Sequence, residues 1–247
     1  TCERMTKTMK YVVIIGDGMA DYKIDALGGK TPLQVANKPR MDYMAKHGTV
    51  GFAHNVPVGM VPESDTANLA VMGYDPVKYS KGRSPLEAVS MGIDMKPDET
   101  AFRINTVALT DGEVYEKQRI LDHSADEITT AEADVLIRAL DEALGDDIRK
   151  FYTGVSYRHC ILWQDGNDKY EFMRPHDILG KRIGDYLPRA EDGGAEFLEL
   201  MKKSYDILNH HPVNEARRAR GLKPANSIWL WSPGKKPQLP DFNAKWG

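Results

Sequence analysis

An unbroken apolar run near the N-terminus constrains the fold most. Residues 11–15, in KYVVIIGDG, are all aliphatic or aromatic, and they lead directly into Gly16, Asp17 and Gly18. Such a run is typical of a parallel strand that is buried on both faces. Open α/β sheets bind ligands at the carboxyl ends of their strands. The sequence therefore predicts an α/β core with Asp17 at its binding edge, although a turn-forming Asp is the simpler alternative.

Two short helices and a second strand are expected after this run. Thr31, Pro32 and Gln34 form a capping box with proline at the first helical position. A second helix, carrying methionines on one face, should end at Gly48. With a strand over residues 49–53, this order predicts a parallel sheet, and we assign residues 1–96 to the first part of the core.

Ser64 lies at the start of the next predicted helix, in VPESDTANLAVMGYDP, which Gly73 should end. The first turn of a helix has free N–H groups and a partial positive charge, so it suits an anion. Ser64 could be only a cap. Beside Asp17, however, a divalent cation could lower the pKa of its hydroxyl and make the serine a nucleophile for a phosphoryl group.

The pattern changes after residue 96. TAFRINTVAL and GEVYEK alternate like the two strands of a hairpin that turns at Asp111 and Gly112. Thr129 and Glu132 form a capping box ahead of a striped helix, and a strand within residues 151–163 and a helix near 195–211 follow. We assign residues 97–224 to an inserted α+β domain. The apolar residues 227–231 then predict a return to the first core over residues 225–247.

Composition excludes several functions. The chain has 247 residues and a formal net charge of −3, so it has no basic footprint for nucleic acid. No apolar run approaches the roughly 20 residues of a membrane-spanning helix, and the N-terminal residues lack a signal-peptide core. We expect a cytoplasmic protein that binds neither nucleic acid nor membrane. Cys2 and Cys160 form no disulfide framework and no metal-ligand spacing.

Basic side chains gather in the second half of the chain. Arg217 and Arg220 lie three residues apart in NEARRARG, Arg158 precedes His159, and His176 lies in RPHD. Guanidinium groups suit phosphate and carboxylate oxygens. A solvated basic face is the alternative for each group taken alone.

Seven segments together resemble a known family. These are VVIIGDGMAD, TPLQVANKP, VPESDTANLAVMGYDP, GRSPLEA, GVSYRH, PHDILGK and HPVNEARRARGLKPANSIWLW, in that order. They are similar to segments of the archaeal-type cofactor-independent phosphoglycerate mutases, which belong to the alkaline phosphatase superfamily. The resemblance implies an α/β fold with an alkaline-phosphatase-like parallel-sheet core, incomplete in this chain, and an inserted substrate-binding domain.

The same resemblance assigns roles to residues of this chain. It implies that Asp17 and Ser64 are metal ligands and that Ser64 also accepts the phosphoryl group. The metals would be two divalent ions, manganese in the first place, with magnesium or zinc as alternatives. Contacts to the phosphate and carboxylate of the substrate would come from Arg158, His176, Asp177, Arg217 and Arg220. We also expect Asp17 and Ser64 to meet at one edge of the sheet.

The resemblance predicts an isomerase that interconverts 3-phosphoglycerate and 2-phosphoglycerate through a phosphoserine. Two departures matter. SADEIT replaces a SAGHIT-like stretch, so Glu127 stands where many relatives have histidine, with His123 four residues upstream. The family's chains also continue into further Asp and His ligands, so we expect little mutase activity from these 247 residues alone. The alternatives are a homoserine kinase-like phosphotransferase and a metal-free fragment that binds phosphorylated metabolites.

Overall fold

The computed structural model describes residues 12–16, 18–80, 82–112 and 114–247. The chain divides into two compact units, Thr1–Ala53 and His54–Gly247, and each is described by itself. The described helices and strands of the first unit are η1 (Asp25–Leu27), α1 (Pro32–Val35) and α2 (Pro39–His47). The capping box of Thr31 and Gln34 is present at α1, and Gly48 follows α2, as predicted.

The strands predicted over residues 11–15 and 49–53 are not formed in the described part of the first unit. Val12 and Ile14 are 80% and 81% exposed. A doubly buried strand needs neighbouring strands on its edges and cover on its faces. The described residues of this unit provide only an isolated bridge between Ile24 and Lys30, which explains why apolar character alone did not produce a strand here.

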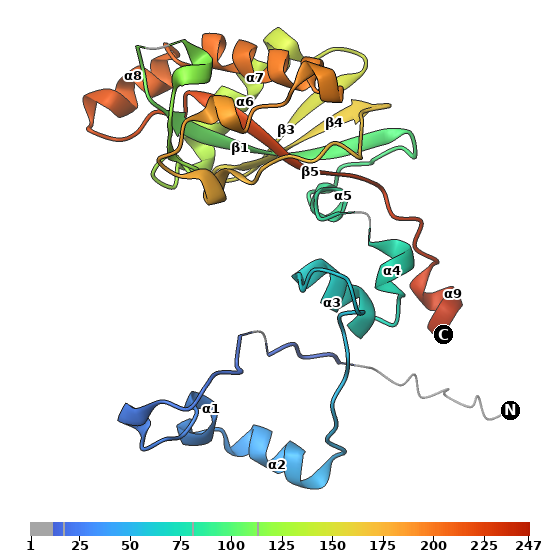
Figure 1. The fold of residues 1–247 in the computed structure, drawn as a ribbon. Coiled ribbons are helices and arrows are strands. Elements are labelled where there is room, and N and C mark those ends of the chain that lie inside the picture. The colour runs from blue at the N-terminus through green and yellow to red at the C-terminus, as the bar shows by residue number, and fades with distance from the viewer. Residues whose placement is uncertain (1–11, 17, 81, 113) are drawn as a thin grey trace, which may run out of the picture. The chain divides into compact units, whose positions relative to one another are not determined.

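An antiparallel sheet organises the second unit (Figure 1). Its strands are β1 (Glu99–Leu109), β2 (Ile120–Asp122), β3 (Arg149–Val155), β4 (Arg158–Gln164) and β5 (Ser227–Lys235). The order is β2-β1-β4-β3, and β5 also pairs with β1. Every pair of these strands is antiparallel. The mixed α/β class is confirmed, whereas the alkaline-phosphatase-like parallel core is not seen in the described residues.

Two strand predictions need correction. The partner predicted in GEVYEK is instead the short helix η2 (Tyr115–Lys117), and β2 forms after it. Residues 227–231 do form a strand, but β5 pairs antiparallel with β1 rather than with a parallel core strand. The strand with which an apolar strand forms hydrogen bonds, and not its own composition, decides which sheet it joins. The wider division into residues 1–96, 97–224 and 225–247 stays a prediction.

Helices cover one face of this sheet. They are α6 (Thr130–Leu144), α7 (Ala195–Leu208) and α8 (Pro212–Ala219), which Figure 1 shows on the opposite side of the sheet from α5 (Ser84–Ser90). The Thr129 side chain caps α6 by accepting from the Glu132 backbone N–H, as predicted. Phe102 and Ile104 of β1 are fully buried in the core beneath these helices. Successive strand residues point to opposite faces, so Arg103 faces away from this core.

A smaller core lies beside α5. Ala88 of α5 packs with Ala101 of β1 and with Cys160 and Leu162 of β4. Because Arg103 is paired with Cys160 across the two strands, it lies on this same face. The remaining elements of the unit are α3 (Ser64–Val71), α4 (Pro76–Tyr79), η3 (Pro175–Ile178), η4 (Ile183–Asp185), η5 (Ala190–Asp192) and α9 (Phe242–Trp246).

Candidate functional site

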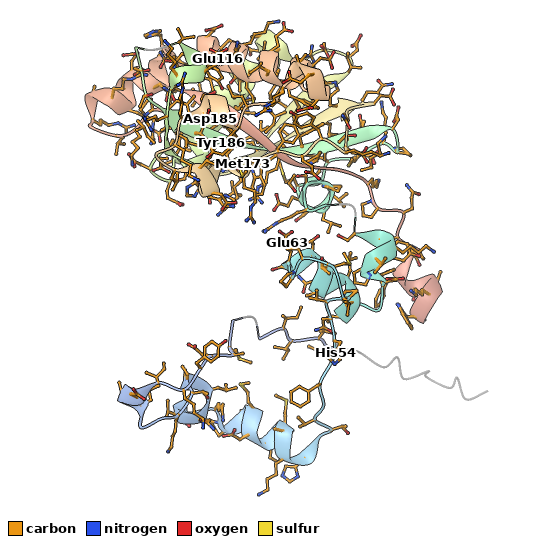
Figure 2. The ribbon with its side chains drawn as sticks, viewed as in Figure 1. His54, Glu63, Glu116, Met173, Asp185 and Tyr186 are labelled. Carbon is orange, nitrogen blue, oxygen red and sulfur yellow. The ribbon has the colours of Figure 1, made fainter. Side chains whose placement is uncertain are left out.

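A cavity of about 970 Å³ lies against the face of the sheet that bears Arg103. Figure 2 labels Glu63, which lines the cavity at the start of α3, and Met173, which precedes the lining residue Arg174. The lining includes four arginines, three glutamates and two histidines, which are Arg83, Arg103, Arg158, Arg174, Glu63, Glu87, Glu171, His123 and His176. The cavity therefore combines an excess of guanidinium groups with two imidazoles.

Strand geometry brings the polar lining together. Asn105 lies two residues after Arg103 on β1, so both side chains point to the same face. The Asn105 side chain accepts a hydrogen bond from the Trp231 indole N–H of β5 at 2.9 Å. It also donates to the backbone carbonyl of His123 at 3.0 Å. Asn105 thus fixes β5 and the segment after β2 on either side of the cavity.

Four rings form a continuous row along the lining. The centroid of Trp231 lies 5.3 Å from that of His176, and His176 lies 5.9 Å from His123. The His123 ring in turn meets Tyr157 edge to face at 5.5 Å. Each ring is held by its neighbour, so the two imidazoles have defined positions without a protein carboxylate bridging them.

A guanidinium group stands at each end of this row. Arg103 lies over the Trp231 ring at 4.6 Å, and Arg158 lies over the Tyr157 ring at 4.4 Å. Arg158 also donates to the Tyr157 hydroxyl at 2.7 Å. Stacking orients a guanidinium group while leaving its in-plane N–H donors free for an anion. Two oriented cations therefore flank the imidazoles.

The electrostatics of the two histidines follow from their surroundings. Burial lowers the pKa of His176, and nearby Arg174 lowers it further, while Asp177 acts in the opposite direction. Among the described residues, the buried Nδ1 of His123 has no hydrogen-bond partner. It lies 3.9 Å from a carboxylate oxygen of Asp122. A neutral His176 and an unpartnered His123 nitrogen are able to accept or donate a hydrogen bond to a ligand.

The cavity contains two of the predicted substrate contacts, Arg158 and His176. Asp177 is not part of the lining; its carboxylate accepts from Arg174 Nε at 2.8 Å and so orients that arginine. Sequence reasoning missed Arg103. The signal was present, because Arg103 and Asn105 are polar residues at alternate positions of the strand, on either side of the apolar Ile104.

Arg217 and Arg220 do not reach this cavity. Arg217 is 2% exposed, and its guanidinium donates to the Lys223 carbonyl, the Glu132 carboxylate and the Ala125 carbonyl at 2.9, 2.8 and 2.5 Å. Arg220 also pairs with Glu132. Both arginines hold α8 against α6, so the structure does not bring them together with Arg158 and His176, and their role as substrate contacts stays a prediction.

Arg217 supports an unusual turn. Ala125, Asp126 and Glu127 all have left-handed backbone conformations, with φ of 48°, 54° and 52°. Residues other than glycine visit this region as single residues, because the side chain crowds the backbone. Glu127 is exposed and is not part of the cavity lining. His123, on the other side of this turn, lines the cavity instead.

Polar contacts hold the turn in place. The Asp122 carboxylate accepts from the Ser124 N–H and hydroxyl, both at 2.8 Å, and from Lys223 Nζ at 3.1 Å. Burial raises the pKa of Asp122, but these hydrogen bonds outweigh burial and lower it to about 2. Lys223 also donates its backbone N–H to Asp126 at 2.8 Å. The segment next to His123 is therefore tightly constrained.

Ser64 is the first residue of α3, and Glu63 rather than Ser64 occupies the cap position. Gly73 has a φ of 76° and follows the helix, as predicted. Ser64 and Asp65 line a separate cavity of about 560 Å³, which shares Arg83 and Glu87 with the first one. One Asp65 carboxylate oxygen is buried without a hydrogen-bond partner in the described part of the chain.

Asp17 lies outside the described residues, so its expected meeting with Ser64 stays a prediction. Within the part of the chain that the structure describes, no group of three or more His, Cys, Asp or Glu side chains could hold a metal ion. A two-metal centre needs about six or more protein ligands. The described residues therefore do not fit such a centre by themselves. The same residues include no helix with the length and apolarity needed to cross a membrane.

Comparisons with known proteins agree with the motifs. Residues 45–214, more than half of the chain, match the family described as 2,3-bisphosphoglycerate-independent phosphoglycerate mutase. A curated relative of that name from Methanosarcina barkeri is 48% identical over 95% of this chain and 57% of its own length. A probable mutase of this type from Geobacter sulfurreducens is 47% identical over 97% of this chain and 59% of its own length.

Solved structures extend the comparison. A protein from Pyrococcus horikoshii superposes with a TM-score of 0.69 at 27% identity, covering 93% of this chain and 52% of that one. A cofactor-independent phosphoglycerate mutase from Thermoplasma acidophilum gives a TM-score of 0.56 at 28% identity, covering 92% and 60%. The chain thus spans less than two thirds of the length of these relatives. It belongs to the 2,3-bisphosphoglycerate-independent phosphoglycerate mutase family.

Proposed function

We propose that this chain supplies the substrate-binding cavity of a phosphoglycerate mutase and that the cavity takes 3-phosphoglycerate and 2-phosphoglycerate. The observation that carries the proposal is the row of two imidazoles with an oriented guanidinium group at each end, Arg103 and Arg158. A phosphoglycerate has a carboxylate at one end and a phosphate on the third or the second carbon. Two separated cations suit such a doubly anionic molecule, because guanidinium groups bind both kinds of oxyanion.

Ser64 is proposed as the phosphoryl acceptor. In the forward half-reaction its Oγ would form a bond to phosphorus as the bond from phosphorus to the substrate oxygen breaks, and the serine proton would pass to that oxygen. The reverse half-reaction would return the phosphoryl group to the other hydroxyl of glycerate. Ser64 is suited to this because it begins an eight-residue helix whose first N–H groups favour an anion.

The divalent ions stay part of the proposal through the family resemblance. Their chemistry would be to lower the pKa of the serine hydroxyl and to neutralise phosphate charge. Because the described residues supply no group of ligands for them, we assign no step to a metal. We therefore expect the 247-residue chain to bind phosphoglycerate with little turnover. This matches the metal-free binding alternative for the chain taken alone.

Titration calorimetry of the 247-residue chain tests the proposal. We expect binding of 3-phosphoglycerate that weakens with salt, and weaker binding of glycerate, which lacks the phosphate. Arg158→Ala should weaken 3-phosphoglycerate about tenfold or more, because a hydrogen bond to a charged group contributes about 1.5–3 kcal/mol. Arg138→Ala is the control, since Arg138 is exposed on α6 and forms an ion pair with Asp134, four residues away on the same helix.

Two results would contradict the proposal. One is equal affinity for glycerate and 3-phosphoglycerate, which would show that the cavity does not read the phosphate. The other is an equal loss of affinity in Arg158→Ala and Arg138→Ala, which would place the binding site elsewhere. A coupled assay of 2-phosphoglycerate formation, run with manganese, would measure any turnover by the chain.

A further inference from the structure

Arg103 is a buried cation with few partners. Its side chain is 6% exposed, and its Nη1 lies 3.2 Å from a carboxylate oxygen of Glu87. Its Nε is buried and has no hydrogen-bond partner among the described residues. One face of the guanidinium group lies over the Trp231 ring. Arginine has five N–H donors; Nε is closed off and Nη1 faces Glu87, so the donors of Nη2 above all remain for a ligand in the cavity.

Glu87 reaches Arg103 from a different layer of the fold. It lies on α5, where the neighbouring Ala88 is fully buried against the sheet. The Ser84 hydroxyl donates to the Ser232 carbonyl and ties the start of α5 to β5. Arg83 donates from Nε to the same Glu87 oxygen at 2.7 Å. The start of α5 is thus tied to β5, and the Glu87 carboxylate is held by Arg83 as well as by Arg103.

We propose that Glu87 is a positioning residue, whose carboxylate holds the Arg103 guanidinium on Trp231 with its free donors directed at an oxyanion of the substrate. This inference rests on the proposed function of the cavity. Glu87 lines the cavity but repels anions, so it can favour binding only through an arginine that it orients, and of its two arginine partners Arg103 is the buried one. Orientation raises affinity because an ordered guanidinium group loses less conformational entropy when the anion arrives.

Position and charge can be separated by substitution. Glu87→Gln keeps a side-chain oxygen that can accept from Arg103 but removes the negative charge. Glu87→Ala removes both. If Glu87 acts by position, the alanine variant should bind anions about tenfold more weakly, and the glutamine variant should bind as well as the wild type or more tightly. If Glu87 acts only by charge, both variants should bind anions more tightly.

The experiment is calorimetric titration of the 247-residue chain with 3-phosphoglycerate and, separately, with inorganic phosphate. Glu199→Ala is the matched control, because Glu199 forms a comparable ion pair with Lys203 four residues away on α7. We expect its affinities to be unchanged. Circular dichroism melting of every variant identifies any loss of folding. If the alanine variant unfolds, the glutamine variant carries the test, because binding of either anion more weakly than by the wild type would overturn the inference.

A double-mutant cycle completes the test. In the Arg103→Gln background, Glu87→Ala should cause no further loss of affinity, because there is no guanidinium group left to position. A further loss there, or equal behaviour of the alanine and glutamine variants, would overturn the inference. Wild-type binding of inorganic phosphate without 3-phosphoglycerate would overturn the proposed function alone, since the cycle can be read with phosphate. No wild-type binding of either anion would overturn both.

Discussion

The cavity arginines and the α8 arginines look alike in the sequence but differ in the fold. Arg158 stacks on Tyr157 and keeps donors for a ligand, whereas Arg217 is 2% exposed and donates from all three of its nitrogens to protein oxygens. Those bonds use three of the five guanidinium donors of Arg217, and burial keeps the other two away from the cavity. Burial and protein acceptors, rather than the residue type or its spacing, separate an arginine that is open to a ligand from a structural one.

Removing Arg217 should have the largest effect on stability. Arg217→Ala leaves two backbone carbonyls without this donor and removes one of the two arginines that pair with Glu132, so we expect the free energy of unfolding to fall by about 3 kcal/mol. Urea denaturation measures the change. Arg220→Ala is the control, because Arg220 pairs with the same Glu132 but is about half exposed, and it should cost about 1 kcal/mol or less. Equal losses in the two variants would remove the distinction drawn above.

Lowering the pH should destabilise the turn at residues 125–127, which the Asp122 carboxylate helps to hold in place. The folded pKa of Asp122 is lowered to about 2, below its ordinary value of 3.8. Its contribution is therefore fully present above the ordinary pKa and is lost as the pH falls through about 4 towards 2. After allowance for partial exposure we expect on the order of 1 kcal/mol.

Urea midpoints between pH 5 and pH 2.5 measure this contribution. Asp122→Asn should lose stability at pH 5 and show a flatter dependence on pH than the wild type. Parallel curves for the two proteins would mean that Asp122 does not titrate in the folded turn.

The smallest expected effect concerns the left-handed turn. Glu127 has a φ of 52° and an exposed side chain, so Glu127→Gly removes a steric cost of about 1 kcal/mol at little loss of packing. Glycine also has more freedom in the unfolded chain, so the net gain should be about 0.5 kcal/mol. Glu142→Gly within α6 should instead lose about 1 kcal/mol. Thermal melting of both variants compares the signs, and a loss in Glu127→Gly would show that the turn is not strained.

Local signals predicted local structure well. Thr129 and Glu132 lie three residues apart, and the Thr129 cap of α6 needed no distant partner, although the Glu132 side chain accepts from the Thr129 hydroxyl rather than from its backbone N–H as a full capping box requires. Apolar character failed for residues 11–15, because a buried parallel strand depends on neighbours that the sequence of the segment does not specify. The same limit applied to β5, which is as apolar as a core strand but pairs with β1.

For the candidate site too, the sequence identified residues but not the contacts that they make with distant parts of the chain. The family resemblance identified Arg158 and His176, which do line the cavity. It could not show that the Arg217 guanidinium group donates hydrogen bonds to oxygens of Ala125 and Glu132, which are distant in sequence. Arg103 escaped notice because its importance comes from burial and from Trp231, and both become visible only when β1 and β5 are paired.

The pairing of β1 with β5 also sets the order in which the sheet can form during synthesis. Val107 meets Ser227 and Thr100 meets Lys235, so the partners are more than about 100 residues apart along the chain. During synthesis at roughly 5–20 residues per second, β1 must wait several seconds or more for its second neighbour. Until then the edge of β1 that will carry β5 is an open template for other strands. A nascent chain of this protein should therefore need protection of this edge, such as chaperone binding, until residue 235 has emerged from the ribosome.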